Sequence, residues 1–101
     1  MTAEELMRSR YSAFATANAD YLRHSWLPAN APRTIHVADA RVWTGLTIVR
    51  TTAGGPFDNT GTVHFEARFE ESDRTGSQSE NSLFTRWKGR WVYVGPAPPS
   101  H

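Results

Sequence analysis

The stretch Thr60-Gly-Thr-Val-His-Phe-Glu-Ala-Arg-Phe-Glu70 alternates between apolar and polar side chains with a period of two. The apolar set is expected on one face of a strand and the polar set on the other. The apolar members are Val63, Phe65, Ala67 and Phe69. One apolar and one polar face are typical of an antiparallel sheet that packs on one side and meets water on the other. The stretch therefore predicts a half-buried antiparallel strand.

Further strands are predicted on both sides of this stretch, because the period of two begins at Val42 and continues almost to the C-terminus. Their ranges are 42–51, 79–87 and 90–94, with a short additional strand at 34–37. Loops are expected at 53–56 and 71–78, and Lys88-Gly89 suits a tight hairpin turn. Strands joined this closely cannot pair in parallel, since parallel pairs need long crossovers. The sheet is therefore predicted to be antiparallel.

The first part of the chain has a helical period instead. Thr2-Ala-Glu-Glu5 has the form of a capping box, and the apolar residues after it predict a helix over 3–16. A second helix is expected from Asn18 or Ala19 to Trp26, ended by Leu27-Pro28 and followed by a linker at 28–33. Helices packed on one face of a curved antiparallel sheet make an α+β fold, a cone whose mouth can hold a ligand. We expect one domain over 1–95 and a flexible proline-rich tail at 96–101.

The composition excludes several classes of function. The 101 residues include no cysteine, which excludes disulfides, thiolate zinc sites and cysteine nucleophiles. The four histidines show no metal-ligand spacing, so neither a metal nor another cofactor is expected. The net charge of +1 is too even to indicate a nucleic-acid or membrane partner. No signal peptide or membrane span is recognised, so the expected location is the cytoplasm.

Arg10 is the unusual charge, because it shares a helical stripe with Leu6 and Phe14 that should face the sheet. A buried guanidinium needs a partner, since an unpaired buried charge is costly. Glu80 is the candidate, because it lies on a strand otherwise poor in charge. The sequence therefore predicts an Arg10–Glu80 ion pair, which either fixes the helix on the sheet or forms part of a ligand site.

Two other patterns have a functional and a structural interpretation. His64 and Glu66 could form an acid–base or metal pair on one strand face, but a solvated face explains them as well. The run Arg86-Trp-Lys-Gly-Arg-Trp91 interleaves basic and aromatic residues, as single-strand nucleic-acid platforms do. A hairpin with packed tryptophans explains the same run, and the near-zero net charge favours the hairpin.

An ordered set of motifs resembles the YchJ-like middle domain over nearly the whole chain, from Leu6 to Gly95. The motifs are Leu6-Met-Arg-Ser-Arg-Tyr-Ser-Ala-Phe14, Asp20-Tyr-Leu22, Trp26-Leu-Pro28, Trp43-Thr-Gly-Leu46, Gly61-Thr-Val63, Glu80-Asn-Ser82 with Phe84, and Gly89-Arg-Trp-Val-Tyr-Val94. The resemblance implies a nuclear-transport-factor-2-like fold and a functionally uncharacterised family. Longer members carry cysteine-rich SEC-C-type segments that look zinc-binding. This chain has no cysteine, so it is either a short member or a middle domain alone.

The function expected from the sequence is a small-ligand-binding or protein-interaction domain without an assignable catalytic activity. The residues expected to line the pocket are Arg10, Tyr11, Trp26, Trp43, Glu80 and Ser82. The alternative, implied by the wider fold, is a small SnoaL-like cyclase, isomerase or hydrolase with a carboxylate or His64 as general base. A deep pocket that holds a carboxylate would favour the enzyme, and a filled cone would favour the interaction domain.

A homodimer is also predicted, because several strands carry large apolar residues on both faces. Trp43 and Val49 are expected opposite Leu46 and Ile48, and the strands at 79–87 and 90–94 follow the same pattern. Two short helices can cover only one face of the sheet. An exposed apolar face usually marks an interface, and homodimers of the wider fold commonly pair through this one.

Overall fold

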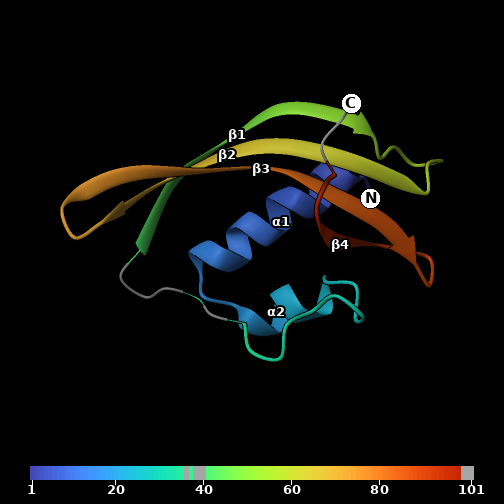
Figure 1. Cartoon of the computed structure of the whole chain (residues 1–101), viewed down its shortest axis with the longest axis horizontal. Coiled ribbons are helices and arrows are strands. Elements are labelled where there is room, and N and C mark those ends of the chain that lie inside the picture. Colours follow the sequence, from blue (N-terminus) through green and yellow to red (C-terminus); the bar gives the residue numbers. More distant parts are fainter. Residues whose placement is uncertain (36, 38–40, 99–101) are drawn as a thin grey trace.

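Two helices followed by a four-stranded sheet make up the computed structural model, which describes residues 1–35, 37 and 41–98. The elements are α1 (Ala3–Ala15), α2 (Ala19–His24), β1 (Arg41–Ala53), β2 (Thr60–Glu71), β3 (Arg74–Trp87) and β4 (Arg90–Pro96). The strand order is β1-β2-β3-β4, and each neighbouring pair is antiparallel. Figure 1 shows the sheet as a curved layer with both helices beneath its concave face. The predicted α+β class and the antiparallel sheet are confirmed. Neither helix in the described part of the chain is long and apolar enough to cross a membrane.

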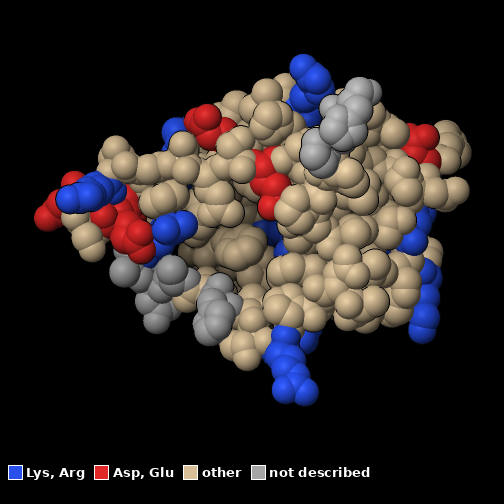
Figure 2. All heavy atoms as spheres, viewed as in Figure 1, with Lys and Arg blue, Asp and Glu red and all other residues tan. Residues whose placement is uncertain are grey.

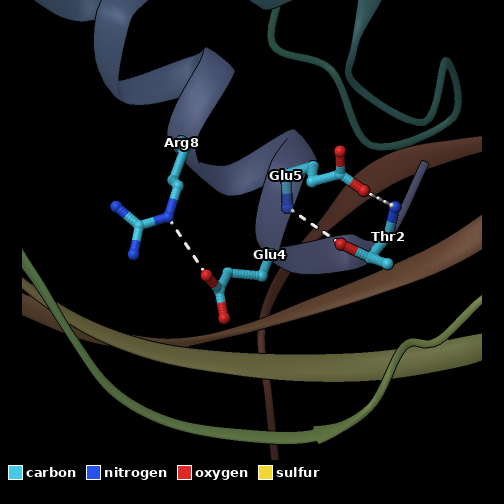
Figure 3. Close-up of polar contacts among 4 residues, drawn as sticks. All are labelled: Thr2, Glu4, Glu5 and Arg8. Atoms are coloured by element: carbon cyan, nitrogen blue, oxygen red, sulfur yellow. Dashed lines mark hydrogen bonds and ion pairs between the residues drawn. The ribbon is translucent and has the colours of Figure 1, made fainter.

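The predicted capping box starts α1. The Thr2 hydroxyl accepts a hydrogen bond from the Glu5 amide at 3.2 Å, and the Glu5 carboxylate accepts one from the Thr2 amide at 2.9 Å (Figure 3). One turn later, Arg8 pairs with Glu4 at 3.1 Å on the exposed side of the helix. The two capping-box hydrogen bonds satisfy backbone amide groups that a helix start leaves free, and they fix where α1 begins.

The hydrophobic core lies between α1 and the concave face of the sheet. Its buried members are Ala3, Leu6, Met7, Val63, Phe65, Ala67, Phe84 and Trp91. The apolar set predicted for β2 therefore faces the core, with Phe69 only half-buried near the end of the strand. Phe84 is completely enclosed.

The alternation predicted for β1 is wrong, because the strand contains two irregularities in its pairing with β2. They lie between Trp43 and Gly45 and between Ile48 and Arg50. An extra residue at a bulge reverses the parity of every residue that follows it. As a result Trp43 and Ile48, together with Leu46, all pack against the core cluster.

The strand β3 is longer than predicted. Ser72 and Asp73, both with positive φ, form the turn between Glu71 and Arg74, so the expected loop at 71–78 is mostly strand. The tip of the β2–β3 hairpin extends beyond the helices (Figure 1), and Arg74, Thr75 and Ser77 are exposed there. A strand that is exposed on both faces has no alternation of apolar and polar residues, so no strand was predicted there.

The segment after α2 joins the sheet edge. The Tyr93 amide donates to the Ser25 carbonyl and the Leu27 amide donates to the Tyr93 carbonyl, both at 2.8 Å. This bridge ends α2 at His24, two residues earlier than predicted, and brings Trp26 beside β4.

The C-terminal part of the chain continues the sheet. β4 extends to Pro96, and the Ala97 amide donates to the Asn81 carbonyl at 2.7 Å, so the first residues of the expected tail pair with β3. Residues 99–101 of that tail lie outside the described residues. The strand expected at 34–37 is not formed by its described members, and His36 is outside the description.

Candidate functional site

A cavity of about 200 Å³ lies between α1, the Trp26 segment and the concave face of the sheet. Its lining residues are Met7, Arg10, Phe14, Trp26, Phe65, Gln78, Glu80, Ser82 and Tyr93. In the space-filling view the surface is hollowed between the sheet and the helical layer, and the walls are largely uncharged (Figure 2). Four of the six residues predicted to line a pocket, Arg10, Trp26, Glu80 and Ser82, therefore come together here.

Arg10 enters this cavity from α1 and is only 3% exposed. Its Nη1 donates to the Leu22 carbonyl at 2.9 Å and to the Ser25 hydroxyl at 2.7 Å. The guanidinium lies 4.9 Å from the ring centre of Trp26 and 4.5 Å from that of Tyr93. Neutral acceptors and aromatic faces thus replace the water that the charge lost on burial.

The predicted Arg10–Glu80 ion pair is wrong. None of the ion pairs among the described residues includes Arg10. Tyr93 connects the two groups instead, because its ring meets the guanidinium and its hydroxyl donates to Glu80 Oε2 at 2.7 Å. Burial lowers the pKa of Arg10 to about 10, against the opposing effect of Tyr93, Tyr21 and Glu80. The guanidinium is therefore still charged at neutral pH.

Glu80 accepts two hydrogen bonds on the same oxygen. The hydroxyls of Tyr93 and Ser82 both donate to Oε2. Within residues 1–35, 37 and 41–98, no donor is bonded to Oε1. The carboxylate is thus held firmly through one oxygen, and the second is available to a ligand.

Unused donors accompany this unused acceptor. Arg10 Nε and Nη2 form no hydrogen bond to a described residue. Trp26 Nε1 is buried and likewise has no partner in the described part of the chain. Met7, Phe14 and Phe65 line the same cavity. A mostly apolar wall with a few convergent polar groups is the usual form of a small-molecule site.

The remaining predicted residues, Tyr11 and Trp43, lie in a neighbouring cavity of about 50 Å³. Their rings meet edge to face with centroids 6.0 Å apart. Met7, Phe14 and Phe65 line both cavities. Sequence reasoning missed these three residues, and also Gln78 and Tyr93. Of these five residues, only Phe65 lay on the strand face that the sequence predicted to be apolar and packed.

His64 and Glu66 lie on the opposite face of the sheet. His64 pairs across the sheet with Asn81 and its Nε2 lies 3.1 Å from the Ser79 hydroxyl. Glu66 lies 3.5 Å from Arg68. His64 does not line the cavity around Arg10 and Glu80, so the structure does not place it where a general base in the cone would act. Among the described residues no group of three or more His, Cys, Asp or Glu side chains could hold a metal.

The second apolar face expected for self-association is largely absent. Trp43, Leu46 and Ile48 all pack on the core, and β2 places Thr62, His64, Glu66 and Arg68 on the outer face. Val92 is buried, and Leu83 and Trp87 are half-buried within the single chain. Val42 and Val49 stay exposed on β1, at 60% and 56%. The homodimer remains a prediction, with a smaller apolar surface than expected.

The titration of the Tyr93 hydroxyl is a measurable property of this site. Burial and the hydrogen bond to Glu80 raise the pKa of Tyr93 well above the ordinary value of about 10. We expect one of the three tyrosines to form its phenolate only at strongly alkaline pH, as followed by ultraviolet absorbance. The Tyr93→Phe variant should lack that late step. A late step that persists in this variant would contradict the assignment.

Comparisons with known proteins identify the relatives of this chain. The family described as "YchJ, middle NTF2-like domain" matches residues 2–96. The UPF0225 protein CE1570 of Corynebacterium efficiens is 47% identical over 92 residues, which cover 91% of this chain and 70% of that protein. The UPF0225 protein SCO1677 of Streptomyces coelicolor is 46% identical, covering 92% and 72%.

Two solved structures share the fold. The solution structure of RPA3114, a SEC-C motif containing protein from Rhodopseudomonas palustris, has a TM-score of 0.83 and 28% identity, covering 98% of this chain and 80% of that one. The crystal structure of a SEC-C motif containing protein from Psychrobacter arcticus has a TM-score of 0.75 and 28% identity, covering 99% and 62%. The names of these relatives state neither a ligand nor a reaction.

Proposed function

The chain belongs to the family of the YchJ middle NTF2-like domain, and on this premise we propose that its cavity binds a small molecule with an apolar body and one polar end. One observation carries the proposal. The wall presents an arginine with two unused donors and a carboxylate with an unused oxygen, on either side of Tyr93. In this proposal the curved sheet and the helices form a cone, and the ligand binds at its open end.

The polar end of this ligand needs both an acceptor and a donor. An acceptor would bond to Arg10 Nε or Nη2, and a donor would bond to Glu80 Oε1. A primary amide has both groups on one carbon. The apolar body would lie against Met7, Phe14 and Phe65. Since the cavity holds about 200 Å³, a single ring with one polar substituent is the expected size.

Benzamide is a suitable probe, because it combines a ring with a primary amide. We expect weak, saturable binding at millimolar concentration, followed by two-dimensional NMR of the labelled protein. N,N-dimethylbenzamide lacks the N–H donors and toluene lacks the whole amide, so both should bind more weakly. Glu80→Gln removes the charged acceptor and should weaken benzamide binding about tenfold.

Glu70→Gln is the matched control, because Glu70 is an exposed carboxylate on the same sheet. This variant should bind benzamide as the unaltered protein does. Equal affinity of the protein for all three probes, or an unchanged affinity in Glu80→Gln, would contradict the proposal.

The alternative is a SnoaL-like enzyme in which Glu80 acts as general base. The unused Oε1 favours it, because a positioned carboxylate oxygen can take a proton from a bound substrate. The Glu80→Gln variant distinguishes the two functions. In an enzyme Glu80→Gln would keep substrate binding and lose turnover, whereas in a binding domain it lowers the affinity itself. Neither function invokes a cofactor, a nucleic acid or a membrane, and a cytoplasmic location is part of the proposal.

A further inference from the structure

A second cavity, of about 410 Å³, lies between the start of α1, the end of α2 and the β3–β4 hairpin. The N-terminus and this hairpin are at the same end of the molecule (Figure 1). Its lining residues include Leu6, Tyr21, His24, Arg86, Arg90 and Trp91. None of the residues that line this cavity also lines the cavity around Arg10 and Glu80. None of them is an aspartate or a glutamate.

The two arginines of this cavity are held in place by neutral partners. Arg86 donates from Nε to the Asp58 carbonyl at 3.0 Å and from Nη2 to the Pro56 carbonyl at 2.8 Å, and its guanidinium lies 4.6 Å from the Trp91 ring centre. Arg90 donates from Nη2 to the His24 carbonyl at 3.2 Å. Because Arg86 is already held by two hydrogen bonds, less of its conformational entropy is lost when a ligand binds.

The positive charge of these arginines is not neutralised locally. The ion pairs found among the described residues involve Arg8, Arg41 and Arg68, but neither Arg86 nor Arg90. The Nη1 group of each has no hydrogen bond to a described residue. Two ordered guanidinium groups thus keep donors available beside a cavity without a carboxylate.

Trp91 forms part of the same wall. The residue is only 3% exposed, and its Nε1 is buried without an acceptor in the described ranges, so this N–H lies beneath the cavity surface. The excess of donors is the complement of an oxyanion, which accepts several charge-assisted hydrogen bonds at once.

We propose that this second cavity binds the phosphate or carboxylate group of a small anionic molecule, with Arg86 and Arg90 as its ligands. The guanidinium groups supply the charge and the directed donors, and the ring of Trp91 and the side chain of Leu6 supply an apolar floor for the rest of the molecule. The two cavities share no lining residue, and Ser25 of this cavity accepts a hydrogen bond from Arg10 of the other.

The probes are inorganic phosphate, phenyl phosphate and benzoate, added at constant ionic strength made up with chloride. We expect saturable NMR shifts at the Trp91 indole N–H, with no shift at the Trp26 indole N–H in the other cavity. Tighter binding of phenyl phosphate than of phosphate would indicate an organic phosphate, and tighter binding of benzoate would indicate a carboxylate. Either order supports the oxyanion site.

Arg90→Gln should weaken the binding of the preferred probe at least tenfold, because one of the two guanidinium ligands is removed. Arg90 is exposed, so the variant is expected to fold, and Arg50→Gln on β1 is the matched exposed control. Glu80→Gln should leave anion binding unchanged, which separates this test from that of the proposed function. No saturable shift, an unchanged affinity in Arg90→Gln, or binding of single-stranded oligonucleotides without binding of the small probes would overturn the proposal.

Discussion

Replacing Phe84 by alanine is expected to lower the free energy of unfolding by about 3–5 kcal/mol. Phe84 has no exposed surface and belongs to the core cluster between α1 and the sheet. Its ring centre lies 5.7 Å from that of Tyr93, so it also supports a wall of the candidate site. The paired strands around Phe84 cannot close the resulting cavity without losing their own contacts. The loss of unfolding free energy is therefore expected to be large for a core substitution of this kind.

Phe57→Ala is the matched control, because the same atoms are removed from a side chain that is 99% exposed. Its unfolding free energy should stay within about 0.5 kcal/mol of that of the unaltered protein. Urea unfolding measures both variants on one scale. Losses of similar size in the two variants would show that the core is not centred where the structure places it.

The second large effect is expected for Arg10→Ala, at about 3 kcal/mol of unfolding free energy. The change removes the hydrogen-bond donor of the Leu22 carbonyl and of the Ser25 hydroxyl. It also removes the cationic contacts with two aromatic rings and leaves a cavity between them. All three losses act at one buried position, and therefore they add to a single large cost.

Arg8→Ala on the same helix is the control, because Arg8 is exposed and its one ion pair within the described residues is with Glu4. An exposed pair of this kind contributes about 0.5 kcal/mol or less. Arg10→Met separates structure from binding, since it keeps most of the volume and removes the charge. We expect Arg10→Met to recover much of the stability lost in Arg10→Ala and still to lose benzamide binding. If Arg10→Ala costs no more than Arg8→Ala, the buried position of the guanidinium is contradicted.

The elements that follow a simple period were predictable. The alternation along β2 and the capping box before Glu5 each arise from residues close in sequence, and both appear in the structure as predicted. The register of β1 was not predictable, because a bulge changes which residues share a face without changing the composition of the strand. The extra residue beside Trp43 moves Leu46 onto the same face as the tryptophan. No pattern in the neighbouring sequence predicts this bulge.

Four of the residues that line the cavity were predictable from the sequence, but the network that joins them was not. Arg10 was recognisable as a charge on an apolar stripe, and Glu80 as a carboxylate on a strand otherwise poor in charge. The residue between them was not recognisable, because Tyr93 reaches Arg10 only through the bridge that residues 25–27 form with β4. That bridge joins segments far apart in the sequence. The guanidinium therefore meets aromatic faces and a carbonyl, where an ion pair had been expected.

The position of bound benzamide tests the account most directly. Intermolecular nuclear Overhauser effects between the benzamide ring protons and the labelled protein locate the probe atom by atom. The account predicts contacts to the Met7 methyl group and to the ring protons of Phe65 and Tyr93, all three of which line the cavity around Arg10 and Glu80. Contacts confined to other surfaces, such as the exposed Phe57, would contradict it.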